Sequence, residues 1–205
     1  MPDRLILNMP DVIETPRLIL RTPRPRDGLL LNSAYHESRS RLERWFLWAQ
    51  KDMTVDEHEI LMRQKHADYI SQDDFMLIIT ERKSNTLIGG SGLHFRKRDP
   101  LIFEIGYWLR TGFEGNGYVS ETVRAIVRVG FEMLKAEKIM LRADSENDRS
   151  KAVAERNRFT FDGIMRHFEP QHNNPEKMID MCFYSLLPDE YESLKKDWWD
   201  MGEKA

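Results

Sequence analysis

Cysteine is almost absent from this sequence, with Cys182 as its only instance among 205 residues. A single cysteine cannot form an intrachain disulfide, and it excludes a zinc site built from several thiolates. No apolar run approaches the roughly 18 residues that would suggest a membrane span. The segment Met1–Pro10 also lacks the basic stretch, apolar core and small-residue cleavage site of a secretory signal. These absences predict a protein of the reducing cytoplasm with no membrane association.

An excess of positive charge is missing as well. The chain has 31 lysine and arginine residues against 34 aspartate and glutamate residues, a formal net charge of −3. This balance argues against a protein that binds nucleic acid through a strong general field. Nucleic-acid binding is therefore the weakest alternative; it would use the short basic runs formed by Arg17, Arg21, Arg24, Arg26 and 96–98. No set of His, Cys, Asp and Glu has metal-ligand spacing, so we expect no metal.

The sequence does contain an alternation of strand and helix patterns. Apolar runs between polar connectors predict strands, and apolar residues at helical spacing predict helices. No repeat, low-complexity tract or long linker divides the chain, so we expect a single domain over residues 1–205 with its core at about 14–187. The fold class is mixed α/β (α+β). The predicted strands are 18–20, 75–80, 87–95, 103–109, 138–142, 159–165 and 177–186, and the predicted helices are 28–44, 55–70, 119–131, 150–156 and 189–201.

The last predicted helix carries an apolar stripe. Tyr191, Leu194, Trp198 and Met201 recur at helical spacing. Such a stripe packs either against the core of its own chain or against a partner. A homodimer is thus one option that the sequence leaves open.

A glycine-rich loop stands between the strand at 103–109 and the helix that follows it. Backbone N–H groups at the start of a helix can face a phosphate with the helix dipole behind them. The G-x-x-G-x-G spacing differs from the dinucleotide fingerprint, and the Lys-Ser or Lys-Thr pair of a P-loop is missing. An anion site and a simple turn are both compatible with the loop, which consists of Gly112, Phe113, Glu114, Gly115, Asn116 and Gly117.

The loop and several separated motifs resemble the GNAT superfamily of N-acetyltransferases, within it the ribosomal-protein acetyltransferases of the RimJ/RimL type. The resemblance covers about residues 14–187. The motifs are Glu14-Thr-Pro-Arg-Leu-Ile-Leu-Arg21, Glu104-Ile-Gly-Tyr-Trp-Leu109, the loop with Gly117-Tyr118, Asn147-Asp-Arg-Ser150, Arg156-Asn-Arg-Phe159 with Gly163, and the pair Trp45 and Trp48. One departure is Gly112, which stands where the wider family has Arg or Gln.

The resemblance implies a mixed, strongly bent sheet flanked by helices, with acetyl-CoA held between two splayed central strands. The backbone of Gly106, Tyr107, Trp108 and Leu109 would polarise the thioester carbonyl, while the Tyr107 and Trp108 side chains pack in the sheet. The glycine loop and Tyr118 would hold the coenzyme pyrophosphate. Asn147 would help to hold the pantetheine arm.

Ser150 is the implied proton donor to the departing thiolate. In the wider family a tyrosine one turn further along often has this role, but Ala154 occupies that position here. The alternative is structural, because Ser150 precedes a short helix and could be its N-cap.

Glu169 is the implied general base. A carboxylate is a weak base for an ammonium group unless burial or a relaying water assists, so we expect Glu169 inside a cleft rather than on a solvated loop. His167 and His172 titrate closer to neutral pH and rank second as bases.

The acceptor side is expected near Trp45 and Trp48, whose i, i+3 spacing would place both on one helix face as a groove wall or as core packing. The resemblance implies an amine acceptor, either a protein N-terminus, as in a ribosomal protein, or a small amine such as a polyamine, aminoglycoside or amino acid. Several pocket carboxylates would indicate a polyamine. A non-catalytic acetyl-CoA sensor remains the alternative outside enzymes.

Overall fold

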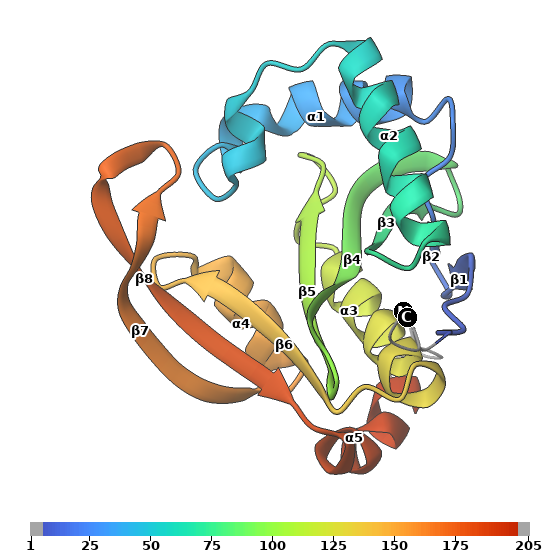
Figure 1. The fold of residues 1–205 in the computed structure, drawn as a ribbon, viewed down its shortest axis with the longest axis vertical. Helices are drawn as coiled ribbons and strands as arrows, with labels where there is room; N and C mark the ends of the chain where they lie inside the picture. The colour runs from blue at the N-terminus through green and yellow to red at the C-terminus, as the bar shows by residue number, and fades with distance from the viewer. Residues whose placement is uncertain (1–5, 201–205) are drawn as a thin grey trace.

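The computed structural model describes residues 6–200, which form one twisted eight-stranded sheet with helices around it (Figure 1). The strand order is β1-β2-β3-β4-β5-β6-β8-β7, and every neighbouring pair is antiparallel except β5 and β6. The fold is therefore the mixed α/β fold that the sequence predicted. The elements are β1 Val12–Glu14, β2 Leu18–Arg21, α1 Gly28–Leu42, the 3-10 helix η1 Leu47–Gln50, α2 Val55–Ile70, β3 Phe75–Glu81, β4 Thr86–Arg98, β5 Leu101–Leu109, α3 Tyr118–Arg128, the π-helix η2 Val129–Met133, β6 Lys138–Asp144, α4 Asp148–Arg156, β7 Thr160–Gln171, β8 Asn174–Leu186 and α5 Pro188–Asp200.

The parallel pair β5 and β6 separates after three paired positions. Ile102, Phe103 and Glu104 pair with residues 138–140, and beyond Glu104 the two strands diverge (Figure 1). On its other side β5 stays paired with β4 as far as Leu109, and β6 stays paired with β8 as far as Asp144. The sheet is thus open only between these two strands, which confirms the expected splay.

Both faces of the central sheet are buried. Side chains alternate along a strand, and on β3 Leu77 and Ile79 belong to the larger core cluster while Ile78 belongs to a second one. The larger cluster includes Val123 and Ile126 of α3, and the second joins the sheet to α1 and α2 through Tyr35 and Met62. This explains why β3 reads as a continuous apolar run.

The helix starts follow local chemistry. α2 begins with a capping box in which Thr54 accepts from the Glu57 N–H while the Glu57 carboxylate accepts from the Thr54 N–H. On α5, Tyr191 and Trp198 are buried in the chain's own core, so the stripe packs internally, while Met201 lies outside the described residues. No helix among residues 6–200 is long and apolar enough to cross a membrane.

Three details differ from the sequence prediction. The short strand β1 and the helix η1 were not expected, because three or four residues show no usable periodicity. The predicted helix 28–44 ends at Leu42. Residues 166–171, expected as a loop, continue β7 along β8, with register shifts that hide the alternation of side chains.

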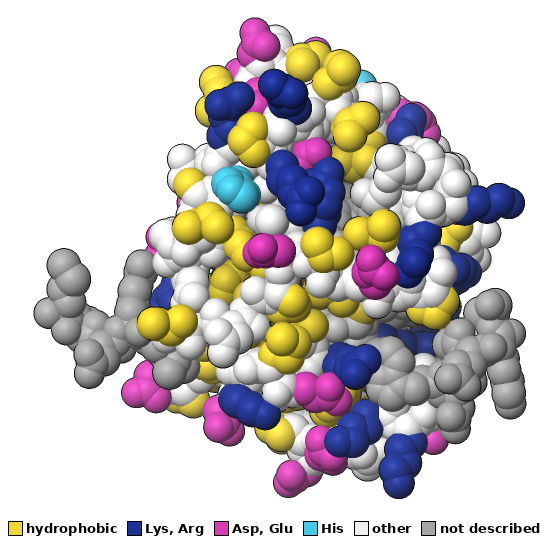
Figure 2. All heavy atoms as spheres, turned by 90° about the vertical axis from the view of Figure 1, so that its right-hand side faces the viewer, with side chains coloured by type: hydrophobic (Ala, Val, Ile, Leu, Met, Phe, Trp, Pro, Cys, Tyr) yellow, Lys and Arg dark blue, Asp and Glu magenta, His cyan; other side chains and the backbone are white. Residues whose placement is uncertain are grey.

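The surface carries both signs of charge. On the face shown in Figure 2, which is the right-hand side of Figure 1, basic and acidic side chains are interspersed. The arginines at the start of the chain are partly neutralised, since Arg17 pairs with Glu121 at 2.6 Å and Arg21 pairs with Asp27 at 2.7 Å. A mixed surface of this kind provides no strong general field for nucleic acid.

Candidate active site

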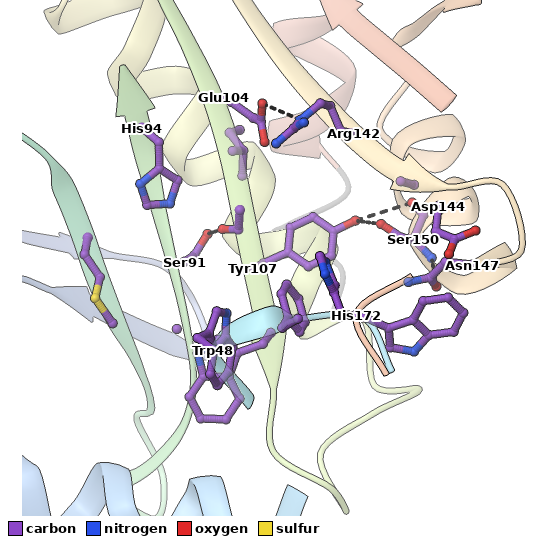
Figure 3. A pocket seen from close by; sticks show the side chains of 18 of the residues that line it. Trp48, Ser91, His94, Glu104, Tyr107, Arg142, Asp144, Asn147, Ser150 and His172 are labelled. Atoms are coloured by element: carbon purple, nitrogen blue, oxygen red, sulfur yellow. Dashed lines mark hydrogen bonds and ion pairs between the residues drawn. The ribbon is translucent and has the colours of Figure 1, made fainter. Parts of the chain in front are cut away.

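A cavity of about 580 Å³ opens where β5 and β6 separate (Figure 3). Its walls come from α1, η1 and α2 on one side and from the β7–β8 hairpin on the other. The predicted site residues Gly106, Tyr107, Trp108, Asn147, Ser150, Glu169, Trp45 and Trp48 all line it. The structure therefore brings the predicted catalytic and acceptor residues together, while the glycine loop lies outside these walls, before α3.

The glycine loop has the backbone conformation of an anion site. Gly112, Gly115 and Gly117 have φ of 93°, 78° and 78°, all in the left-handed region that other residues adopt at a cost. Gly117 is the N-cap of α3 and provides no side-chain cap. The first-turn N–H groups of α3 remain available as donors, so the loop fits a pyrophosphate.

Arg17, the residue before β2, supports this loop. Its Nη1 donates to the carbonyl of Asn116 at 2.9 Å, its Nε donates to Glu121 at 2.6 Å, and its guanidinium lies over the Tyr118 ring. Sequence reasoning missed this role and noted only that Gly112 replaces the usual Arg or Gln. The loop is thus supported by an arginine that is distant in sequence.

Glu114 has an unexpected role within the loop. One of its carboxylate oxygens accepts from Arg41 at 2.6 Å and from Arg149 at 2.5 Å. Glu114 was predicted to contact the coenzyme, but in the structure its carboxylate holds two exposed arginines beside the loop. These guanidiniums add positive charge at the place where phosphates are expected.

Ser150 forms a hydroxyl pair with Tyr107. The Tyr107 hydroxyl lies 2.9 Å from Ser150 Oγ (Figure 3), and Asn147 Oδ1 accepts from the Ser150 N–H at 3.1 Å. Asn147 is therefore the N-cap of α4, and the alternative that Ser150 is this cap is wrong. Burial raises the pKa of Tyr107 to about 12, despite the hydrogen bond with Ser150 that lowers it. Tyr107 stays protonated at neutral pH and can donate to Ser150, a role beyond the sheet packing predicted for its side chain.

Trp45 and Trp48 do not share a helix face, so that prediction is wrong. Trp45 lies in the turn after α1, and Trp48 lies in η1, because α1 ends at Leu42. Both line the cavity, and the Trp48 ring meets the Trp108 ring edge-on at 6.0 Å. The turn between α1 and η1 therefore places both tryptophans on the cavity wall.

Glu169 lies on β7 beside a register shift and lines the cavity. Its side chain is 32% exposed, and its carboxylate is 3.9 Å from His172 Nε2. His167 has a left-handed φ of 50°, is exposed and lies at a different, smaller hollow. Of the three base candidates, Glu169 and His172 share the cavity and His167 does not.

His94 is a further titratable group at the site, which sequence reasoning missed. Its Nδ1 lies 2.6 Å from Asp74 Oδ1, and a Cβ built on Gly106 would lie 3.2 Å from its Nε2. Burial raises the pKa of Asp74, but His94 and Lys65 outweigh this and hold it below its usual value. Asp74 is thus ionised, and it orients the imidazole over Gly106 with Nε2 facing the cavity. In the sequence, the only sign of this role was a single histidine near the end of a predicted strand.

The remaining carboxylates of the cavity are engaged. Glu104, which is 9% exposed, accepts from Arg96 at 2.7 Å and from Arg142 at 2.8 Å. Asp144 accepts from the backbone N–H of Glu146 at 2.8 Å. Within residues 6–200, no group of three or more His, Cys, Asp and Glu could hold a metal ion.

The parallel strands β5 and β6 separate beside a loop that fits a phosphate, and side chains that can carry a proton lie at the opening. This arrangement is typical of an acyltransferase. The profile of the acetyltransferase (GNAT) domain matches residues 17–160, well over half of the chain, and the protein belongs to this family. It is an acetyl-CoA-dependent N-acetyltransferase.

Relatives agree with this assignment. YdaF of Bacillus subtilis (strain 168), whose name provisionally describes a ribosomal N-acetyltransferase, is 26% identical over 185 residues, covering 87% of this chain and 95% of YdaF. The structure is similar to RimL, the ribosomal L7/L12 alpha-N-protein acetyltransferase in complex with coenzyme A, with a TM-score of 0.79 and 21% identity over 87% of this chain and 99% of RimL. The Microcin C7 self immunity acetyltransferase MccE, in complex with acetyl-CoA and AMP, also gives 0.79, at 18% identity over 87% of this chain and 97% of MccE.

Proposed function

We propose that this acetyltransferase modifies the α-amine of a protein N-terminus. The observation that carries the proposal is the state of the carboxylates in the cavity. Glu104 is held by two arginines and Asp144 by a backbone N–H, which leaves Glu169 as the one lining carboxylate without a hydrogen-bond partner in the described chain. Polyamines and aminoglycosides carry several positive charges and require several free carboxylates. A single ammonium group on an otherwise peptide-like acceptor matches the one free acid.

The names of similar proteins support the same acceptor class. YdaF and RimL are both named for ribosomal proteins, and RimL is named for an α-amine. A ribosomal protein N-terminus is accordingly the first acceptor to test. The cavity has a volume of about 580 Å³ and is lined by residues of η1 and of the β7–β8 hairpin, so we expect an extended chain end to enter between them.

In the proposed mechanism, Glu169 takes the proton of the acceptor ammonium, directly or through water. The neutral amine then attacks the thioester carbon, a C–N bond forms and the C–S bond breaks. Ser150 gives its proton to the leaving sulfur and recovers one from Tyr107, which the 2.9 Å contact permits. The proton on Glu169 passes to solvent. The nitrogen becomes cationic on attack and loses a second proton as the amide forms. This second proton, passed on through solvent, replaces the one that Tyr107 gave to Ser150, so the net reaction releases one proton.

The coenzyme would be held by the backbone of Gly106–Leu109, by Asn147 and by the glycine loop. The three left-handed glycines and the uncapped start of α3 fit a pyrophosphate. The thioester supplies the activated acetyl group, and the chain supplies orientation and proton transfer.

An acceptor screen tests the proposal. Purified protein and acetyl-CoA are incubated with N-terminal peptides, diamines, aminoglycosides and free amino acids, and free thiol release is measured. We expect release with peptides and an acetyl group on the α-amine by mass spectrometry. Turnover of diamines or aminoglycosides alone would contradict the proposal, and coenzyme binding with no turnover of any amine would favour the sensor.

A further inference from the structure

Two arginines share one carboxylate oxygen at the inner end of the cavity. Arg96 of β4 and Arg142 of β6 both donate through Nε to Oε2 of Glu104, which lies on β5 between them (Figure 3 shows the Glu104–Arg142 bond). Glu104 is nearly buried, whereas the side chains of Arg96 and Arg142 are 44% and 25% exposed. All three line the cavity.

The two guanidiniums are incompletely paired. Within residues 6–200, neither arginine makes a hydrogen bond other than its Nε bond to Glu104. The Phe168 ring lies 5.6 Å from the Arg142 guanidinium, which steadies that side chain without neutralising it. The two guanidiniums share one hydrogen-bonding carboxylate, Glu104, and the Glu169 carboxylate acts on Arg96 electrostatically without a hydrogen bond. The four terminal nitrogens are planar donors of the kind that bind carboxylates in pairs.

The position of this group relative to the reacting centre sets the length of its ligand. Glu104 and Gly106 are two residues apart on the same face of β5, so their Cα atoms are about 7 Å apart. Gly106 belongs to the backbone expected to polarise the thioester, so the acceptor amine must come close to it. A second acceptor group that reaches the arginines must extend about 7 Å from that amine. The carboxylates of a free α-amino acid and of an Asp at the first residue are too close to the amine, whereas a Glu at the first residue or an acidic side chain at the second has the required reach.

We propose that Arg96 and Arg142 form a carboxylate subsite, so that the preferred acceptors are protein N-termini with Glu at the first residue or with Asp or Glu at the second. This inference rests on the proposed function. An acceptor carboxylate would accept hydrogen bonds from the terminal guanidinium nitrogens, which neither Glu104 nor Glu169 binds, while Glu104 keeps the two guanidiniums in place. Glu169, on β7, would take the proton of the amine.

The test compares C-terminally amidated peptides that differ only by Glu against Gln at the first residue, or by Asp against Asn or Glu against Gln at the second. A pair with Asp against Asn at the first residue is the short control. We expect kcat/KM to favour the acidic peptide by about 10-fold to 100-fold, mainly through KM, because a charge-assisted hydrogen bond is lost in the amide. Arg142→Gln and Arg96→Gln should each reduce the preference. Arg98→Gln is the matched control, since Arg98 lies on the same strand but does not line the cavity, and it should keep the preference.

Equal kcat/KM for acidic and amide peptides would overturn the subsite while leaving the proposed function intact. If no peptide is turned over, the proposed function fails, and the subsite is then tested by binding. Quenching of tryptophan fluorescence, with Trp45 and Trp48 on the cavity wall, reports on peptide binding to the intact protein. Tighter binding of acidic peptides that Arg142→Gln abolishes would support the subsite, and equal binding would overturn it. Thermal melts show whether each arginine variant is folded. One folded variant, Arg96→Gln or Arg142→Gln, is enough for the test.

Discussion

One part of the site, its backbone side, consists of backbone groups of a nearly continuous stretch, from Gly106 to Gly117 and the start of α3. The other part, its side-chain side, consists of side chains from separate elements: Trp48 from η1, His94 from β4 and Glu169 from β7. The backbone side fits a ligand that never changes, the coenzyme. The side-chain side can change by single substitutions, which suits the selection of an acceptor.

The contrast also predicts different responses to mutation. A side chain that carries a proton can be removed without altering the fold, and its loss should appear in kcat. A glycine with a positive φ cannot be replaced without strain, and its loss should appear in coenzyme affinity and stability. The four predictions below test this division.

Glu169→Gln should have the largest effect. It keeps the size of the side chain and removes the base, so we expect a fall of about 10²–10⁴ in kcat with little change in coenzyme affinity. Wild-type activity should rise with pH, and the variant should retain only the limb of the acceptor amine, near a pKa of about 8. Steady-state rates across neutral and alkaline pH measure this. Near-wild-type turnover would transfer the role to His94, which Asp74 already orients over Gly106.

Ser150→Ala should lower kcat by about 10²-fold, because the leaving sulfur loses its proton donor. Tyr107→Phe should have a smaller effect, since Ser150 keeps its own proton. Ser150 is not the N-cap of α4, so Ser150→Ala should leave the melting temperature nearly unchanged. The matched control is Asn147→Ala, which removes the cap and should cost about 1 kcal/mol of stability. A rate loss that only follows a lowered melting temperature would remove Ser150 from the mechanism.

Gly117→Val should weaken coenzyme binding by a smaller factor, about 10-fold, measured by calorimetry. A Cβ at Gly117 would meet only Arg17 Nη2, at 3.5 Å, so the cause is backbone strain at φ of 78° and not crowding within the protein. Gly163→Ala is the control, because Gly163 has φ of 145° on β7, away from the loop. It should lower stability without changing coenzyme affinity. Equal coenzyme affinity in the wild type and Gly117→Val would exclude the loop from the site.

Asp74→Asn should have the smallest effect, about 1 kcal/mol of stability at neutral pH. Since the pKa of Asp74 is lowered in the folded protein, its contribution is present above the ordinary value of 3.8 and is lost as pH falls through the folded value. Urea unfolding should therefore show the gap between wild type and variant narrowing under acid. Asp68→Asn is the control, because Asp68 shares Lys65 but does not contact His94. A gap that stays constant with pH would mean that the ion pair does not contribute.

The backbone side was readable from the sequence, whereas much of the side-chain side was not. The glycine loop and the α3 pattern are contiguous, so the spacing predicted a glycine-rich turn before a helix, and the resemblance added the expected coenzyme role. The interactions that were missed join distant residues: Tyr107 with Ser150 across 43 positions, His94 with Asp74 across 20, and Arg17 with Asn116 across 99. Periodicity tells which face of a strand a side chain takes, but not which other element comes to lie opposite.

The short pairing between β5 and β6 also affects how the two halves of the sheet can move. Only three positions pair across it, whereas the β4–β5 and β6–β8 pairs run nearly to the strand ends. The sheet thus consists of two extensively hydrogen-bonded halves, β1–β5 and β6–β8, which are joined only by the three paired positions of β5 and β6. A change in the angle between the two halves would break fewer hydrogen bonds there than elsewhere in the central sheet. A ligand that binds both β5 and β6 would fix this angle, so the two halves should move as one rigid body when coenzyme is bound.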